Sequence, residues 1–416
     1  MSRPTLQTIL DGINGLAHLS SVPEVATMGI EALLGDARPI ISHLSGKESM
    51  VFPTHFRPSV GMRLPGTDYV LTKALTTTGL STLWHAEQCI WPDPRRLMRP
   101  VVVKFIMLAG MEQKKKAVIL KRARREAKVA GYLVNHPGIV ELYHSDVLYD
   151  ENGEPVAVVL VYEDHDCDLE ALGKALGHRF PLRLARHLIL QTCQALAYAH
   201  NPHVGVTSRD IKPANILIAL APGKRRASAE SGSVEGGHSG GGDPLGRCNA
   251  KLTDFGLARE SDPDALDATL THGGMLGTVM FMPPEQAKGR HVNASDVYSL
   301  GETWKYVLTG RLPFHTESFH PNGNEILTLL LQGKTPTPLR ELLPEAAYLP
   351  QAMIEVFDGM TVFEPSKRLD IEECIMQFEE MQIPRDPPNP LAQTMALAAI
   401  ESGQTSDGSD DDYDSK

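Results

Sequence analysis

Ten residues in the middle of the chain, Ser208–Leu217, read SRDIKPANIL and combine an acid, a base and an amide. Because a proline interrupts the stretch, we expect Asp210, Lys212 and Asn215 in a turn rather than in a helix. A carboxylate in that position can accept a proton from a hydroxyl group, while the lysine neutralises phosphate charge. Such clusters also occur in solvated loops, so the interpretation depends on the neighbouring segments.

Downstream, the motif Asp254–Gly256 (DFG) follows a short apolar segment. A carboxylate at the end of a strand, beside a turn glycine, can bind a divalent metal ion, and Asn215 offers a second oxygen ligand. Hard cations such as magnesium prefer oxygen ligands and keep water and substrate phosphates in the remaining positions. The triplet alone also arises by chance, and its place after the first stretch gives it weight.

Upstream, Lys104 ends the β-branched run VVVK. A lysine among valines costs free energy unless its ammonium has a partner. On the helix expected over Glu112–Val134, apolar and small residues recur at steps of three and four, and Glu126 lies within this inward stripe. We therefore predict a Lys104–Glu126 ion pair. The basic residues mostly off the stripe are interpreted as a solvated face: Lys114, Lys115, Lys121, Arg122 and Arg125.

Length and composition limit the possible classes of protein. The chain has 416 residues, 42% of them hydrophobic and 22% charged, which is typical of a globular protein with two lobes or domains. A net charge of -11 disfavours a nucleic-acid partner. The five scattered cysteines include no CxxC pair, so neither a zinc site nor a disulfide framework is indicated. Without a signal peptide or membrane-spanning run, we expect a cytoplasmic location and no membrane partner.

The order of the segments predicts an α+β fold. Strand-rich sequence runs from Tyr69 to about Val161, and after Leu169 the pattern becomes mostly helical, with short strands near Ile216 and Leu252. Strands first and helices later is the order expected of two lobes.

Three segments stand apart from this core, expected over residues 66–382. Residues 1–65 carry apolar residues at helical spacing and are interpreted as a helical N-terminal extension, which packs on the core or alternatively docks a partner or regulates. Residues 221–250 are rich in Gly and Ser and predict a surface loop inserted between two strands. Residues 383–416 form a tail whose acidic end is expected to be disordered.

Together the motifs resemble those of eukaryotic-type serine/threonine protein kinases, in the style of the bacterial members, over roughly residues 69–382. A nearly full set of motifs in this order is far more specific than any single match. The resemblance implies a bilobal protein-kinase fold, with a small β-rich N-lobe carrying one long helix and a larger α-helical C-lobe. The segments on which the resemblance rests are VVVK (101–104), RREAKVAGYL (124–133), NHPGIVELY (135–143), SRDIKPANIL (208–217), LTDFGLA (252–258), GTVMFMPPEQ (277–286), SDVYSLGETWKYVLTGRLPF (295–314) and PSKRL (365–369).

The resemblance implies transfer of the γ-phosphoryl group of ATP, with Mg, to a serine or threonine hydroxyl of a protein substrate. Asp210 is then the catalytic base, and Lys212 lies beside the γ-phosphate. Lys104 contacts the α- and β-phosphates and pairs with Glu126. Magnesium is expected on Asn215 and Asp254. The implied ATP-binding residues are Thr76, Thr78, Gly79, Ser81, Leu83, Lys104, Val161, Tyr162, Asp164, Asn215 and Asp254.

The same resemblance implies structural roles. Glu285 is expected to form an ion pair with Arg368, and Asp296 to brace the catalytic loop by accepting hydrogen bonds from backbone N–H groups. The segment Tyr162–Asp164 is expected to be the hinge beside the adenine, with Val161 as a small gatekeeper residue behind it.

The chain departs from the family pattern in the loop that covers the phosphates. In LTTTGLSTLWHA (75–86), Thr76, Thr78 and Ser81 occupy the three glycine positions, and only the intervening Gly79 remains. Side chains there restrict φ and limit the approach of backbone N–H groups to phosphate, although the hydroxyls can still donate hydrogen bonds. We therefore expect weaker ATP binding or altered motion of this loop.

Ser208 is a second departure, because the family has a histidine there that packs under the metal-binding loop. The serine is expected to leave a gap costing about 1–3 kcal/mol, without removing a catalytic group. Since the charged residues needed for phosphoryl transfer are all present, we favour an active enzyme. The alternatives are a pseudokinase scaffold that binds nucleotide weakly and a small-molecule phosphotransferase of the same broad fold.

Arg209 precedes the catalytic aspartate, which in this family suggests control by a phosphate in the activation segment, here Leu257–Met275. Autophosphorylation there would let a phosphate pair with Arg209 and order the segment. Alternatively, the aspartates of the segment supply standing negative charge. The candidate acceptors are Ser261, Thr269 and Thr271.

Overall fold

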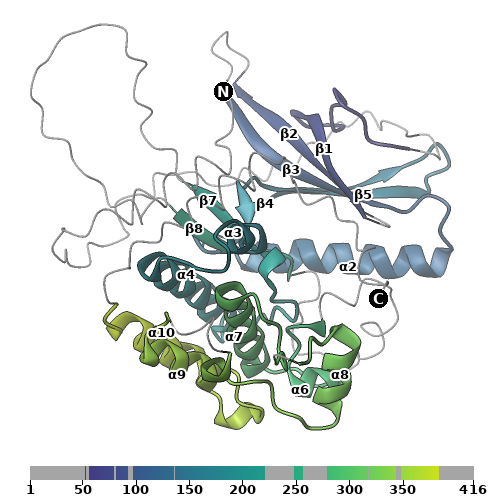
Figure 1. Ribbon diagram of the computed structural model, residues 1–416. Helices are drawn as coiled ribbons and strands as arrows, with labels where there is room; N and C mark the ends of the chain where they lie inside the picture. The colour runs from purple at the N-terminus through teal and green to yellow at the C-terminus, as the bar shows by residue number, and fades with distance from the viewer. Residues whose placement is uncertain are drawn as a thin grey trace, which may run out of the picture. The chain divides into compact units, whose positions relative to one another are not determined.

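The structure is a computed structural model that describes Phe52 and residues 56–78, 81–91, 97–134, 136–220, 248–255, 279–316, 318–342 and 348–383. The expected N-terminal helices, residues 221–247, the activation segment and the acidic tail lie outside these residues. The chain folds into two compact units (Figure 1). Among the described residues, the N-terminal unit comprises residues 52–131 and 141–164, and the C-terminal unit comprises residues 132–140 and 165–383.

The N-terminal unit is an antiparallel sheet of five strands in the order β1-β2-β3-β5-β4, together with one long helix. The apolar run expected to be a strand is β3, which pairs with β2 on one side and with β5 on the other. Alternate residues of such a strand face opposite sides of the sheet. The elements are β1 (Tyr69–Thr78), β2 (Ser81–Trp91), β3 (Leu97–Met107), α2 (Gln113–Tyr132), β4 (Leu142–Tyr149) and β5 (Pro155–Glu163).

Two apolar clusters lie on the two faces of this sheet. One includes Ala123 of α2 together with Leu160 of β5, which confirms the expected inward stripe of the helix. The other includes Val103 and Phe105 of β3, packed with Phe56 from the chain ahead of β1. The packed N-terminal unit therefore begins before residue 66, the expected start of the core domain.

The C-terminal unit combines a small antiparallel sheet, ordered β6-β7-β8, with a set of helices. The predicted insertion joins β7 to β8, as expected, although its last three residues belong to β8. The elements are β6 (Cys167–Asp168), α3 (Leu169–Ala175), α4 (Leu182–His200), η2 (Pro213–Asn215), β7 (Ile216–Leu220), β8 (Cys248–Leu252), α6 (Pro284–Ala287), α7 (Asn293–Thr309), α8 (Gly323–Leu331), η6 (Leu339–Glu341), α9 (Gln351–Met360), η7 (Pro365–Lys367) and α10 (Ile371–Glu380).

Helix α7 is the buried centre of this unit, because nearly all of its side chains are enclosed by neighbouring elements. Trp304 is fully buried, and its indole N–H donates a hydrogen bond to Thr192 of α4 over 3.1 Å. The helix ends at Gly310, whose φ of 70° is the left-handed conformation that a helix C-terminus favours. A helix held this firmly can position polar groups at its start.

The predicted α+β architecture is confirmed, with the strands concentrated in the first unit and the helices in the second. No helix in the described part of the chain is both long and apolar enough to cross a membrane.

Candidate active site

In the N-terminal unit, the structure confirms the pairing of Lys104 with Glu126. Lys104 lies on β3 and Glu126 on α2, and 3.6 Å separate the ammonium nitrogen from Oε1. The glutamate side chain is 10% exposed and the lysine side chain 22%, so the pair is only partly screened by solvent. The inward stripe of α2 is what turns Glu126 toward the sheet.

Tyr162 is the third member of this group, because its hydroxyl donates a hydrogen bond to the same Oε1 of Glu126. In the register of β3 with β5, Lys104 lies opposite Leu160, and Val102 lies opposite Tyr162. These side chains therefore share one face of the sheet.

Val161 lies on the other face, fully buried in the cluster that contains Val103 and Phe105. The structure thus places Tyr162, rather than Val161, beside the Lys104–Glu126 pair. The expected gatekeeper position moves by one residue, because PVAVVLVY is apolar throughout and its sequence does not reveal which alternate residues face the helix.

The strands β1 and β2 form the hairpin that carries the expected phosphate loop. Thr76 pairs with Leu83, and Thr78 pairs with Ser81 at the end of the hairpin, while Gly79 lies outside the described residues. Leu83 also lies opposite Lys104 in the register of β2 with β3, so it belongs to the same sheet face as the lysine.

Asp164 directly follows β5, where the hinge is expected. Its carboxylate lies 3.7 Å from Nδ1 of His85 on β2, and only 5% of its side chain is exposed. Sequence reasoning did not anticipate this contact with His85.

In the C-terminal unit, the structure brings together Asp210, Lys212 and Asn215. Oδ2 of Asp210 accepts hydrogen bonds from the lysine ammonium at 2.9 Å and from the Asn215 amide at 3.0 Å. The same amide donates to the backbone carbonyl of Asp210 at 2.8 Å. The other carboxylate oxygen, Oδ1, is buried and has no hydrogen-bond partner among the described residues.

The two expected metal ligands lie at the same end of the β7–β8 hairpin. Asn215 immediately precedes β7, Asp254 follows β8 by two residues, and Ile216 pairs with Leu252 between them. The amide of Thr253 donates to the carbonyl of Asn215 at 3.0 Å, which ties the two segments together. Asp254 has a φ of 57°, a strained conformation for a residue with a side chain and one that is common at functional sites.

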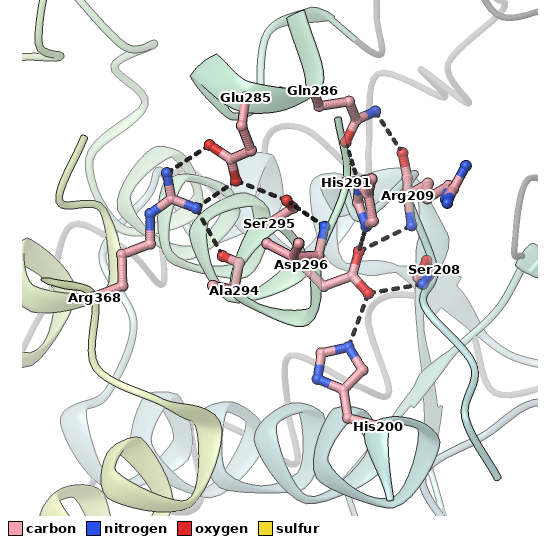
Figure 2. Close-up of polar contacts among 11 residues, drawn as sticks. His200, Ser208, Arg209, Glu285, Gln286, His291, Ala294, Ser295, Asp296 and Arg368 are labelled. Carbon is pink, nitrogen blue, oxygen red and sulfur yellow. Dashed lines mark hydrogen bonds and ion pairs between the residues drawn. The ribbon is translucent and has the colours of Figure 1, made fainter. Parts of the chain in front are cut away.

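Asp296, at the start of α7, braces the catalytic loop as predicted (Figure 2). Its carboxylate accepts hydrogen bonds from the backbone N–H groups of Ser208 at 2.7 Å and Arg209 at 2.9 Å. This contact needs no side chain at position 208, which explains how a serine can occupy it. The imidazoles of His200 and His291 also bind this carboxylate.

Burial opposes ionisation of Asp296, but its two histidine neighbours outweigh burial and hold its pKa well below the usual range for an aspartate. The fully buried carboxylate is therefore charged, and it can act only as an acceptor.

The predicted ion pair of Glu285 with Arg368 is also confirmed. Two guanidinium nitrogens of Arg368 bind the two carboxylate oxygens at 2.6 and 2.8 Å, and Ser295 donates to Oε1 at 2.6 Å (Figure 2). Burial raises the pKa of Glu285, but the bonds from Arg368 and Ser295 outweigh it, so that the pKa is lowered overall. Such bidentate pairing gives a geometrically specific link.

Sequence reasoning missed His200, Gln286 and His291, which complete the support of the catalytic loop in Figure 2. Each contacts a partner far along the chain or across a turn, so spacing carried no signal for it. The one indication in the sequence was Asp296 itself, which lies in an apolar helix. A buried carboxylate requires several hydrogen-bond donors, so further donors near Asp296 could have been expected.

Comparison with known proteins agrees with these observations. The model of the protein kinase domain matches residues 95–378. The serine/threonine-protein kinase PknA of Mycobacterium tuberculosis is 32% identical over 361 residues, which cover 84% of this chain and 70% of that protein. PknB of Mycolicibacterium smegmatis is 34% identical over 224 residues, covering 54% of this chain and 30% of that protein. A probable serine/threonine-protein kinase of Streptomyces coelicolor is 28% identical over 341 residues, covering 81% and 43% respectively.

The chain belongs to the protein kinase family, in its bacterial, eukaryotic-type serine/threonine branch. It is accordingly an ATP-dependent protein kinase. Members of this family use a divalent metal ion and act on protein substrates. The family match begins after β2, so the preceding hairpin, where Thr76, Thr78 and Ser81 are expected at the glycine positions, lies outside the match.

Proposed function

We propose that Asp210 is the catalytic base of a magnesium-dependent transfer of the ATP γ-phosphoryl group to a protein serine or threonine. The observation that carries this proposal is the asymmetry of its carboxylate. Oδ2 is held by Lys212 and Asn215, whereas the buried Oδ1 has no partner among the described residues. A buried oxygen without a donor is costly, and a substrate hydroxyl supplies the missing donor.

Lys212 has a second role in this proposal. Its ammonium lies 2.9 Å from Asp210, so it fixes the rotamer of the base while its positive charge remains available to the transferred phosphoryl group. The lysine side chain is 25% exposed, which leaves part of the ammonium accessible to a substrate.

Asn215 and Asp254 fit a magnesium ion. The Asn215 amide nitrogen is engaged by Asp210, and its amide oxygen has no described donor, so the oxygen is left as a ligand. Amide and carboxylate oxygens are ligands that magnesium accepts alongside substrate phosphates. When bound, the ion neutralises charge on the phosphates of ATP.

In the nucleotide site that we propose, Lys104 holds the α- and β-phosphates and Glu126 orients the lysine. Leu83 and Tyr162 supply apolar and aromatic surface on the same sheet face. Asp164 belongs to the hinge, and Thr76, Thr78, Gly79 and Ser81 cover the phosphates. The position of Tyr162 replaces the earlier expectation for Val161.

Around this site we propose the remaining organisation expected from the sequence. The kinase acts in the cytoplasm, autophosphorylates within residues 257–275, and uses the part of residues 1–65 that precedes Phe52 as a packing or docking extension. Ser261, Thr269 and Thr271 are the proposed acceptors, and a phosphate there would pair with Arg209.

The experiment that tests this function is transfer of radiolabelled phosphate from magnesium ATP, followed by mass-spectrometric mapping of the labelled residues. We expect labelled serine or threonine in the purified chain and none in Asp210→Asn, whose amide cannot accept the proton. Asn215→Asp is a second variant, because it keeps an oxygen ligand and alters the contact to Asp210. Equal labelling of wild type and Asp210→Asn would mean that a contaminating kinase is responsible and that the pseudokinase alternative holds.

A further inference from the structure

His291 lies within hydrogen-bonding distance of two side chains, one on each side of its ring, and it does not belong to the expected catalytic set. Its Nε2 is 3.1 Å from Oδ1 of Asp296, and its Nδ1 is 2.9 Å from Oε1 of Gln286 (Figure 2). Only 5% of its side chain is exposed. The donors and acceptors around it therefore determine its protonation state.

The orientation of the Gln286 amide is fixed by its other contact. Its nitrogen donates to the backbone carbonyl of Arg209 at 3.1 Å, and a carbonyl oxygen can only accept. The amide oxygen must then face His291, so Nδ1 of the histidine is the donor. Reversing the amide would set two oxygens against each other at the Arg209 carbonyl.

The contact on the other side leads to the same conclusion. The Asp296 carboxylate already accepts from the amides of Ser208 and Arg209 and from Nε2 of His200. Three donors stabilise its charged form, so Nε2 of His291 donates as well. A histidine that donates from both nitrogens is an imidazolium.

Arg209 is the residue that this arrangement holds. Asp296 binds its N–H and Gln286 binds its carbonyl, and His291 links these two partners. Arg209 has a φ of 68°, a strained conformation that persists only when its surroundings enforce it. Asp210 is the next residue, so a loosened Arg209 moves the proposed base.

We propose that His291 is a positioning residue, held as an imidazolium, whose two hydrogen bonds clamp the backbone of Arg209 and thereby orient Asp210. This inference rests on the proposed role of Asp210 for its kinetic consequence, but the charge of His291 can be measured without any activity. Loss of either ring proton removes one of the two hydrogen bonds and weakens the clamp.

Several charged and titratable groups of the described residues lie at the clamp or beside it. Asp296 on α7 faces His291 directly, and His200 at the end of α4 faces the same carboxylate from the other side. Arg209 lies on the catalytic loop, and the neighbouring Glu285 of α6 is engaged by Arg368 and Ser295. His200 needs only one ring proton for its contact, which makes it the matched control.

The direct test is nuclear magnetic resonance of the full chain labelled with ¹⁵N-histidine, with His291→Gln used to assign the signal. We expect both nitrogens of His291 to carry protons at neutral pH. In Gln286→Met, which removes the Nδ1 acceptor, that second proton should be lost at a lower pH than in wild type. A neutral imidazole in wild type at neutral pH would overturn the proposal, whether or not the protein is an active kinase.

The kinetic test measures phosphorylation of dephosphorylated casein against pH. In wild type we expect kcat to decrease toward alkaline pH. In His291→Gln, whose side chain does not titrate, this alkaline limb of the pH profile of kcat should be absent. At neutral pH His291→Gln should lower kcat about tenfold, with KM for ATP changed less than about twofold. His200→Gln should lower kcat while retaining the alkaline limb.

If the alkaline decrease of kcat persists unchanged in both His291→Gln and Gln286→Met, the proposed role of His291 is wrong. Thermal unfolding of each variant identifies a loss of folded protein, and Gln286→Met provides a second route if His291→Gln does not fold.

Discussion

Two buried or half-buried carboxylates support the proposed catalytic groups, and they are held very differently. Asp296 of the C-terminal unit is fully buried and accepts four hydrogen bonds, two of them from the loop that it supports. Glu126 of the N-terminal unit lies 3.6 Å from the ammonium of Lys104, whose side chain is 22% exposed, and accepts a hydrogen bond from the hydroxyl of Tyr162. A carboxylate saturated with buried donors is costly to disturb, whereas an ion pair with a partly exposed partner can be broken and remade at smaller cost.

This contrast matches the tasks that we propose for the two units. A base must stay within hydrogen-bonding reach of its substrate, so its support is rigid. A lysine that binds phosphates must release product, so its partner can exchange contacts.

The largest effect is expected from Asp296→Ala. Removing the carboxylate leaves two backbone N–H groups and two buried imidazole rings without their acceptor, which should lower the free energy of unfolding by about 3–5 kcal/mol. Urea denaturation measures it. Glu364→Ala is the control, since its pair with Lys367 is mostly exposed and should contribute less than about 1 kcal/mol. Similar decreases in the free energy of unfolding in the two variants would show that the hydrogen bonds to Asp296 stabilise the fold no more than an exposed ion pair does.

The next effect concerns Glu285→Gln, which removes the charge that Arg368 binds. We expect about 2 kcal/mol of destabilisation at neutral pH. Because the pKa of Glu285 is lowered on folding, its contribution is present above the ordinary glutamate value of 4.5 and is lost as pH falls through the folded value. The difference between variant and wild type in urea denaturation should therefore shrink in acid. A difference that stays constant with pH would exclude this origin.

A smaller effect is expected from Tyr162→Phe, which removes the hydroxyl from Glu126 and retains the ring. We expect KM for ATP to change about threefold with kcat nearly constant, because one hydrogen bond to Glu126 is lost while its contact with Lys104 is kept. Steady-state kinetics over a range of ATP concentrations distinguishes the two constants. Val161→Ala on the opposite sheet face is the comparison, and it should affect stability rather than KM. The reverse pattern would restore the gatekeeper position to Val161.

The smallest effect is expected in the phosphate loop. Replacing Thr76, Thr78 and Ser81 together by glycine should lower KM for ATP about twofold, because the backbone N–H groups can then approach phosphate more closely. Thr77→Gly changes the same strand at a position outside the family pattern and serves as the control. An increase in KM for the triple variant would indicate that the hydroxyls themselves bind the phosphates.

Most of the fold and the charged residues of the site could be predicted from the sequence. The spacing along α2 placed Glu126 opposite Lys104, and the proline in the catalytic loop placed Asp210 and Asn215 in a turn. These features depend on local periodicity and on residue chemistry, which a sequence displays directly.

The parts that could not be predicted depend on long-range geometry. The sequence did not reveal that Tyr162 rather than Val161 faces Glu126, since an all-apolar strand has no alternation to read. It also did not show that His200 and His291 converge on Asp296, because they come from separate elements. Their convergence is decided by tertiary packing alone.

The β7–β8 hairpin has a practical consequence for protein engineering. Asn215 and Asp254 lie at one end of these strands, and the chain joining Leu220 to Cys248 leaves from the other end, about 13 Å away along the strand. Residues 221–247 join the two strands at that point. It is therefore a suitable place to graft a fluorescent reporter or an affinity tag whose bulk stays clear of the reacting groups.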